Sequence, residues 1–250
     1  MAKKKRGKFW FIRMILFALV ACVGGIIGIY RQSIKVEPGD QVKVIDVSSW
    51  NGKVHWSKVK KEGIFYAMIR IGRGNTGTEK MAEDAWFLRN YESGKFYNMR
   101  MGLYFYSYAT TEKEAKAEAE YCLQLLKKHK IDPEDLELPI AYDVEEKSTF
   151  ATGRKNVSNL TAVFCDTIKE AGYTPMVYSS AGHLLKYFKH STIKDYQIWV
   201  AHYGVEKSGP SYPYAYDMWQ YTCEGIVPGA NTSGEDDKGN CDINYYTVHK

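Results

Sequence analysis

The chain has 250 residues, of which 45% are hydrophobic and 25% are charged. These fractions are close to those of ordinary globular domains, and they exclude a disordered, collagen-like or disulfide-dense polypeptide. The net charge of +5 is uneven, because residues 1–13 contribute +6 and residues 14–250 therefore sum to −1. A short basic tail carries the positive charge, so we expect no nucleic-acid-binding face on the rest of the chain.

The first predicted element is an apolar segment behind the basic tail. Residues 14–30 contain no charged side chain, and a helix that begins at Phe9 is long enough to cross the roughly 30 Å core of a bilayer. The positive charges before it favour a tail that stays inside the cell, with the rest of the chain exported. We divide the chain into a cytoplasmic tail at 1–8, a transmembrane signal anchor at 9–30, a linker at 31–41 and a catalytic domain at 42–250.

An uncleaved anchor is the interpretation we favour for this segment, but the sequence leaves two alternatives. Leu19-Val20-Ala21-Cys22 resembles a bacterial lipobox, in which the cysteine is lipidated after cleavage. Ordinary removal by a signal peptidase is the second alternative. The apolar residues 23–30 favour the uncleaved anchor, because a lipoprotein normally turns polar after its cysteine.

From residue 42 onward, short β-rich apolar runs alternate with amphipathic helical stretches, a pattern typical of βα units around a mostly parallel sheet. Eight strands are predicted, at residues 42–47, 65–71, 99–108, 138–144, 175–179, 197–201, 218–221 and 242–245. Helices are predicted at residues 56–61, 79–91, 111–130 and 156–171. The stretches between the later strands are short. We therefore predict an α/β fold, an irregular (β/α) TIM-like barrel with shortened or missing late helices.

The clearest predicted helix is the one at residues 111–130. Thr111 and Glu114 form a capping-box pattern at its start, and three lysines close it where the helix dipole favours cations. We expect its glutamate and lysine side chains to form a solvated face without a function.

Four acidic residues lie at the ends of predicted strands. They are Asp46 in the first strand, Asp143 and Glu145 at the end of the fourth, and Asp242 at the start of the last. The active sites of parallel barrels collect at the carboxyl ends of the strands, so acids at these positions are candidates for chemistry. Residues i and i+2 of a strand face the same side about 6.6 Å apart, which allows Asp143 and Glu145 to face one substrate. Surface charges at a strand end are the alternative explanation of this pair.

Crowded carboxyl groups do not ionise independently. Repulsion and partial burial raise the pKa of one acid while its neighbours stay ionised. A glycosidase needs this combination, because one acid donates a proton while an ionised partner assists cleavage of the same bond. The cluster of acids therefore favours glycoside hydrolysis.

Nine short motifs carry a family resemblance. They are DVSSWNG at 46–52, WSKV at 56–59, GIFYAMIR at 63–70, GLYFY at 102–106, YDVE at 142–145, VYS at 177–179, WVAHY at 199–203, WQY at 219–221 and DIN at 242–244. Together they cover residues 42–246 in the family's order, and this region resembles the glycoside hydrolase family 25 muramidases, the lysozymes of the Chalaropsis type. The resemblance implies an irregular α/β barrel that cleaves the β-1,4 bond between N-acetylmuramic acid and N-acetylglucosamine in peptidoglycan.

The resemblance also implies roles for individual residues. Glu145 would be the general acid, Asp143 its carboxylate partner, and Asp46 and Asp242 the other two acids of the active site. The residues implied to line the sugar-binding groove are Tyr104, Tyr178, Trp199 and Gln220. The role of Asp143 stays open between direct attack, activation of water and orientation of the substrate's own 2-acetamido group, and we favour the last. The long polar stretch at 231–240 departs from the family's pattern.

We therefore predict a peptidoglycan hydrolase held in a bacterial cytoplasmic membrane, with its catalytic domain on the cell-wall side. Its expected partners are peptidoglycan glycan strands and, through the N-terminal helix, the membrane; protein partners are not predicted. The six histidines lack the spacing of a metal site, so we expect no metal and no other cofactor. The rival predictions are a non-catalytic glycan-binding scaffold and a glycosidase for another N-acetylated polymer such as chitin.

Two cysteines, Cys223 and Cys241, flank the last predicted loop. Because the domain is expected to be exported, a disulfide could join them. Two reduced buried thiols agree equally well with the sequence.

Overall fold

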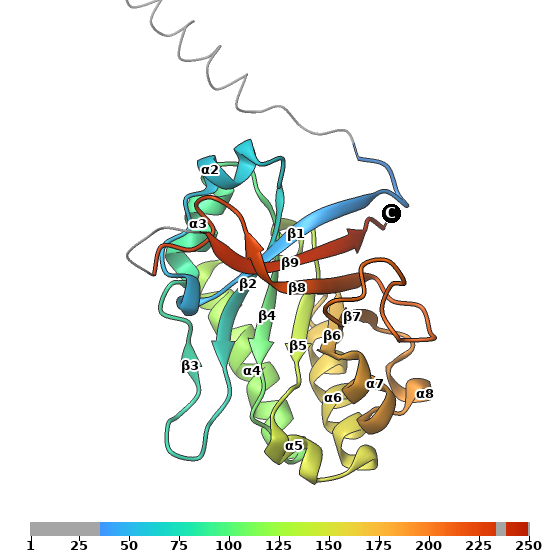
Figure 1. Cartoon of the computed structure of the whole chain (residues 1–250). Helices are drawn as coiled ribbons and strands as arrows, with labels where there is room; N and C mark the ends of the chain where they lie inside the picture. The colour runs from blue at the N-terminus through green and yellow to red at the C-terminus, as the bar shows by residue number, and fades with distance from the viewer. Residues whose placement is uncertain (1–35, 234–238, 250) are drawn as a thin grey trace, which may run out of the picture. The chain divides into compact units, whose positions relative to one another are not determined.

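The computed structural model describes residues 36–233 and 239–249. Every one of the eight predicted strands is present, as β1 (Gln41–Val47), β2 (Tyr66–Arg73), β4 (Arg100–Tyr106), β5 (Ile140–Asp143), β6 (Pro175–Ser180), β7 (Gln197–Ala201), β8 (Met218–Ile226) and β9 (Asn240–Thr247). Around the sheet the order is β1-β9-β8-β7-β6-β5-β4-β2, and pairing between β1 and β2 closes it into a barrel (Figure 1). The predicted barrel is confirmed.

The sheet is mostly parallel, as predicted, with the last strand as the exception. Strands β1, β2 and β4 to β8 run parallel to one another. β9 is antiparallel to both β1 and β8, because it follows β8 through a hairpin connection instead of a helical crossover.

Seven α-helices are described, and two short 3-10 turns accompany them. The helices are α2 (Trp56–Lys61), α3 (Phe87–Phe96), α4 (Glu112–His129), α5 (Lys147–Ala151), α6 (Arg154–Glu170), α7 (Ala181–Tyr187) and α8 (His190–Ile193), and the turns are η1 (Ser49–Asn51) and η2 (Pro133–Asp135). Within the described part of the chain no helix follows β7 or β8, so the predicted loss of late helices is confirmed.

The helix predicted at 79–91 is wrong in its first half. A two-residue strand, β3 (Ala82–Glu83), pairs antiparallel with the end of β2 and holds this stretch extended. The helix α3 begins only at Phe87. By contrast, α4 begins as predicted, where the Thr111 hydroxyl accepts a hydrogen bond from the Glu114 backbone N–H.

None of the helices described at residues 36–233 and 239–249 is both long and apolar enough to cross a membrane. The predicted anchor at 9–30 and Cys22 lie outside the described residues.

The strands separate two apolar cores. Inside the barrel, side chains such as Val44, Met68 and Met218 pack together with Trp199. Outside it, the sheet packs against the helices. For example, the ring of Tyr142 on β5 stacks on that of Phe164 on α6, with the ring centroids 3.9 Å apart. Because successive residues of a strand alternate between faces, residues two positions beyond an interior residue also point inward.

Gly102 shows how tightly the barrel interior is filled. A Cβ atom at this position would lie 2.6 Å from the Leu138 Cβ and 2.7 Å from the Met68 sulfur. The barrel interior beside Gly102 therefore has no room for even one added methyl group.

Candidate active site

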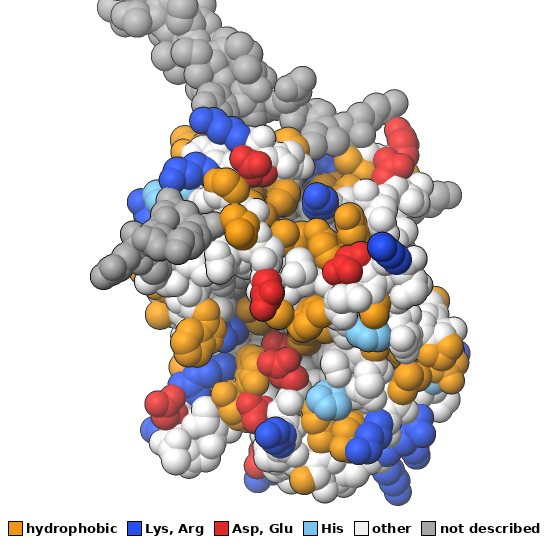
Figure 2. All heavy atoms as spheres, in the orientation of Figure 1, with side chains coloured by type: hydrophobic (Ala, Val, Ile, Leu, Met, Phe, Trp, Pro, Cys, Tyr) orange, Lys and Arg blue, Asp and Glu red, His pale blue; other side chains and the backbone are white. Residues whose placement is uncertain are grey.

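A cavity of about 390 Å³ opens at the carboxyl ends of the barrel strands. All eight residues singled out in the sequence line it, namely Asp46, Tyr104, Asp143, Glu145, Tyr178, Trp199, Gln220 and Asp242. On the face drawn in Figure 2, acidic side chains lie near the middle of the domain beside hydrophobic ones. The structure thus brings the candidate residues together, although they come from seven different strands or strand ends.

Asp46 and Asp242 form a carboxyl pair at one side of the cavity. They lie directly opposite each other in the antiparallel pairing of β1 with β9. Burial, the charge of Asp46 and a hydrogen bond with it raise the pKa of Asp242 to about 9. The Asp46 Oδ2 also accepts hydrogen bonds from the Gln220 amide at 3.0 Å and the Asn244 amide at 2.8 Å. Burial also raises the pKa of Asp46, so the two carboxyl groups titrate as one coupled pair that keeps a proton at neutral pH.

Asp143 ends β5 inside the barrel and is 5% exposed. Its Oδ1 is buried and has no hydrogen-bond partner among the described residues. Burial raises the pKa of this carboxyl group well above its usual value, with repulsion from Glu145 and Asp46 adding to the effect and the Arg70 guanidinium opposing it. A buried acceptor without a partner normally costs free energy, so this oxygen is a point where a bound ligand can supply the missing hydrogen bond.

Glu145 lies just beyond β5, which ends at Asp143. The strand thus ends one residue earlier than the predicted 138–144, and both acids line the same cavity, as expected. Glu145 is exposed at the cavity mouth. The desolvation of its carboxyl group raises its pKa, with Glu146 and Asp46 adding repulsion, while a hydrogen bond from Tyr106 lowers it.

The residues predicted to contact sugar form the floor of the cavity. The Tyr178 hydroxyl donates to the Gln220 Oε1 at 2.7 Å, and the Tyr203 hydroxyl donates to the same oxygen at 2.6 Å. The Trp199 indole N–H donates to the Asn244 side chain at 2.7 Å. Trp199 and Gln220 are each 2% exposed, so only their edges can reach a ligand in the cavity.

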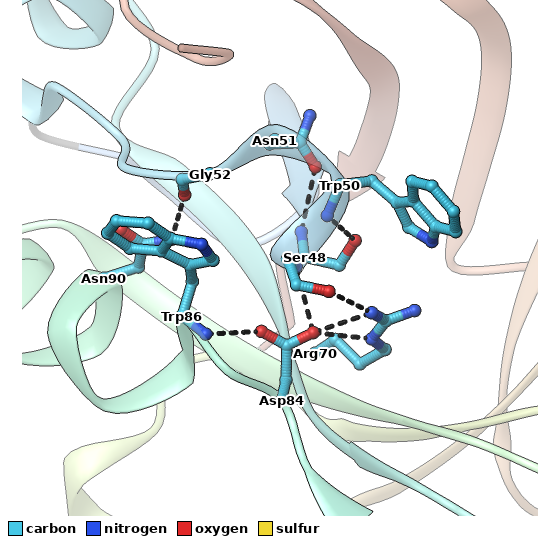
Figure 3. Close-up of polar contacts among 9 residues, drawn as sticks. Ser48, Trp50, Asn51, Gly52, Arg70, Asp84, Trp86 and Asn90 are labelled. Carbon is cyan, nitrogen blue, oxygen red and sulfur yellow. Dashed lines mark hydrogen bonds and ion pairs between the residues drawn. The ribbon is translucent and has the colours of Figure 1, made fainter. Parts of the chain in front are cut away.

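Sequence reasoning missed a second group of residues at one edge of the cavity. Arg70 lines the cavity and forms an ion pair with the buried Asp84 at 2.7 Å. Trp50, on η1, also lines it and is 79% exposed (Figure 3). Arg70 and Trp50 fall within the quoted motifs, which were a usable signal, whereas nothing in the sequence marked Asp84.

The two cysteines are free thiols in the structure. Cys241 is buried and pairs in register with Gly225, while Cys223 lies on the other side of a bulge in β8 and is exposed. The structure thus has neither a disulfide between them nor two buried thiols, since only Cys241 is buried. Asn231 and Asn240, at the ends of the unusual polar stretch, line the cavity rim.

No group of three or more His, Cys, Asp or Glu side chains within the described ranges is arranged to hold a metal ion. The cavity lining itself offers carboxyl groups with raised pKa values, surrounded by tyrosine hydroxyls and amides.

A closed α/β barrel with four acids around a cavity at the carboxyl ends of its strands has the arrangement of a glycoside hydrolase. Within that class, the family model described as Glycosyl hydrolases family 25 matches residues 45–230. The chain belongs to this family. The resemblance seen in its motifs is confirmed.

Similar proteins include an autolytic lysozyme from Clostridium acetobutylicum, which is 28% identical over 197 residues. That match covers 79% of this chain and 55% of the lysozyme, so the chain spans about half the length of this relative. YegX, an uncharacterized protein of Escherichia coli K12, is 28% identical over 210 residues, with 80% of this chain and 70% of YegX covered.

Solved structures show the same fold. The modular autolysin LytC from Streptococcus pneumoniae, solved in complex with a synthetic peptidoglycan ligand, has a TM-score of 0.68 and 26% identity, with 84% of this chain and 48% of LytC covered. The spore cortex lytic enzyme SleM from Clostridium perfringens has a TM-score of 0.70 over 85% of this chain and 69% of SleM. Its identity of 19% makes it a likeness of fold alone.

Proposed function

We propose that this chain is a peptidoglycan hydrolase, an N-acetylmuramidase that cleaves the β-1,4 bond between N-acetylmuramic acid and N-acetylglucosamine. The observation that carries the proposal is that two acids line one cavity. The Asp143 Oδ1 is buried without a hydrogen-bond partner among the described residues, and Glu145 lies at the mouth of the cavity. Membership of family 25 and the printed names of an autolytic lysozyme and a peptidoglycan-bound autolysin support it.

Glu145 is the general acid in this proposal. Its raised pKa keeps it protonated to higher pH than an ordinary glutamate, so it can donate a proton to the glycosidic oxygen as the bond to the muramic acid C1 breaks. The leaving N-acetylglucosamine hydroxyl takes that proton. Glu145, now ionised, accepts a proton from the water that completes hydrolysis.

Asp143 orients the substrate in this proposal. The N–H of the muramic acid 2-acetamido group supplies the hydrogen bond that the Asp143 Oδ1 lacks, and the acetamide carbonyl oxygen then attacks C1. Water opens the resulting ring at C1 from the face that the leaving sugar occupied. The product therefore retains its anomeric configuration. An inverted product would exclude this route in favour of direct attack by water.

The test is digestion of purified peptidoglycan by the full chain in detergent, with mass spectrometry of the released fragments. We expect fragments that end in reducing N-acetylmuramic acid from the wild type, and a loss of at least a hundredfold in Glu145→Gln because a general acid contributes roughly 10²- to 10⁴-fold. Glu224→Gln is the matched control, since it removes an exposed carboxyl group on β8 that does not line the cavity.

Two results would contradict the proposal. Binding to the cell wall without any fragments from the wild type would favour a non-catalytic scaffold. Faster cleavage of chitin than of peptidoglycan would favour the other rival function.

We also propose that residues 9–30 anchor the enzyme in the bacterial cytoplasmic membrane, with the barrel on the cell-wall side. The uncharged run at 14–30 and the basic tail before it support this topology. Fractionation of cells and protease digestion of spheroplasts test this topology. The full-length chain should sediment with the membranes, and protease added outside spheroplasts should digest the barrel or release it from the cell surface. Recovery of the chain from the cytoplasmic fraction would overturn it.

A further inference from the structure

One side chain at the cavity rim is exposed against expectation. Trp50 is 79% exposed, although it is among the largest apolar side chains and lies on a domain with an otherwise well-filled interior. It lines the same cavity as the four acids. Exposed aromatic side chains beside a binding cavity commonly contact ligand, because stacking against a ligand removes their apolar surface from water.

The turn that carries Trp50 is fixed on one side by Asp84 (Figure 3). The Asp84 Oδ2 accepts a hydrogen bond from the Ser49 backbone N–H at 2.9 Å and from the Arg70 Nε at 2.8 Å. A guanidinium N–H of Arg70 also donates to the Ser49 hydroxyl at 2.7 Å. The Asp84 side chain is 1% exposed, so this charged contact is shielded from water.

The other side of the turn is fixed by its own side chains and by the polar stretch before β9. The Asn51 carbonyl accepts from the Thr232 backbone N–H at 2.9 Å, and the Asn51 side chain accepts from the Ser48 backbone N–H at 2.9 Å. In Figure 3 the Trp50 indole extends outward from this turn, away from Asp84. The backbone is thus held in place while the ring is left uncovered, which lowers the entropy cost of binding a ligand there.

A pyranose ring is the ligand whose chemistry fits this position. Its axial C–H groups form an apolar face that stacks on an indole, and its hydroxyl and acetamide groups lie around the edge. Asn231 and Asn240 line the same cavity as Trp50. The Asn231 side chain is hydrogen-bonded to the Asn240 carbonyl and to Ser233, while Asn240 is exposed and carries an amide that can pair with those edge groups. The position is continuous with the acid-lined cavity, so the same polysaccharide strand can reach both.

We propose that Trp50 forms a sugar-binding subsite at the cavity rim, which stacks on a pyranose of the glycan strand away from the cleaved bond and favours long strands over short ones. This inference rests on the proposed function, because it assumes that the cavity cleaves a glycan. Asp84 and Arg70 act as positioning residues for this subsite, since they hold the turn and not the sugar.

The test compares hydrolysis of long peptide-free glycan strands and of a tetrasaccharide prepared from them, by the full chain in detergent. We expect Trp50→Ala to raise KM for long strands by roughly five- to tenfold, the range of a lost stacking contact, with kcat little changed. KM for the tetrasaccharide should stay near the wild-type value. Trp50→Phe should recover part of the loss. Phe96→Ala is the matched control, because Phe96 is 80% exposed on α3 and does not line the cavity.

The outcomes separate this inference from the function on which it rests. Absence of hydrolysis by the wild type would overturn the proposed function. Wild-type hydrolysis with an unchanged KM in Trp50→Ala would overturn the subsite alone. An equal loss on both substrates, carried by kcat, would also overturn it, because Trp50 would then act on the shape of the catalytic cavity.

Discussion

The protonation of Glu145 depends on two neighbours that act in opposite directions. The charge of Glu146 raises the pKa of Glu145, while a hydrogen bond from the Tyr106 hydroxyl lowers it. The Tyr106 hydroxyl has a single proton and donates to Glu146 at 2.7 Å, so Glu145 and Glu146 compete for one donor at the cavity mouth. Because a general acid must be protonated to act, the alkaline limb of activity follows this pKa.

Two single substitutions should therefore shift the alkaline limb of the pH–activity curve in opposite directions. Tyr106→Phe removes a hydrogen bond that favours the carboxylate, so the Glu145 pKa rises and activity persists to higher pH. Glu146→Gln removes a repelling charge, so the Glu145 pKa falls and activity is lost at lower pH. The measurement is kcat/KM on peptidoglycan against pH for both variants beside the wild type. Displacement of both limbs in one direction would rule out Glu145 as the group that titrates.

At the scale of elements, one buried acid of α4 holds the ends of two barrel strands, β4 and β5. The Glu118 side chain accepts hydrogen bonds from the Tyr142 hydroxyl at 2.6 Å, the Ser107 hydroxyl at 2.9 Å and the Tyr108 backbone N–H at 3.0 Å. The Ser107 backbone N–H in turn donates to the Asp143 carbonyl at 2.9 Å. Glu118 is 2% exposed, so the expectation of a purely solvated face of glutamates on this helix is wrong at this position.

Removal of this acid should cost much more stability than its replacement by an amide. Glu118→Ala leaves three donors beside a cavity, and we expect it to lower the free energy of unfolding by about 2–4 kcal/mol. Glu118→Gln keeps the shape, and the two hydroxyls can turn to accept from its amide, so the loss should be about 1 kcal/mol or less. Urea unfolding at pH 7 measures both values. Equal losses would show that the hydrogen bonds to Glu118 contribute little.

The same acid explains a glycine after β2. A Cβ atom at Gly74 would lie 1.8 Å from the Glu118 Oε1, and that oxygen is held in place by its hydrogen bond. Gly74→Ala should therefore destabilise the wild type by about 2 kcal/mol or more, and much less in a Glu118→Ala background. Additive losses in this double-mutant cycle, measured by urea unfolding, would place the cause elsewhere.

The sequence predicted the elements whose signals are local. The alternation of β-rich runs with helical stretches predicted the barrel, and the position of four acids at strand ends predicted the acid-lined cavity. The pattern at Thr111 and Glu114 predicted the start of α4. It did not predict β3, because Ala82 and Glu83 are held extended only by pairing with Arg73 and Gly72, which lie 9 and 11 residues earlier in the chain. Nor did it identify Asp84 or Glu118, because whether an acid is solvated or buried under a loop is decided by tertiary packing and not by periodicity.

For the whole molecule, the acid cluster makes stability depend on pH. The pKa values of Asp46, Asp143, Glu145 and Asp242 are all raised, mainly by burial. The folded protein therefore binds more protons than the unfolded chain between the ordinary carboxyl pKa, near 4, and the pKa of about 9 of Asp242. Because protonation in this range favours the folded state, the free energy of unfolding should fall as the pH rises through it.

Asp242→Asn should relieve part of this cost. An asparagine amide can donate to Asp46 as the protonated Asp242 does, and it carries no charge at any pH. We expect the variant to be more stable than the wild type by about 1–3 kcal/mol at pH 8, to show a flatter dependence on pH, and to lose activity on peptidoglycan. Thermal unfolding between pH 5 and pH 9 measures the stability change, with Glu224→Gln, an exposed position on β8, as the control. A variant that is less stable than the wild type at pH 8 would contradict this expectation, because other groups of the protein would then already offset the cost of ionising the acids. A stable but inactive variant would show that the barrel gives up stability to keep four acids in one cavity.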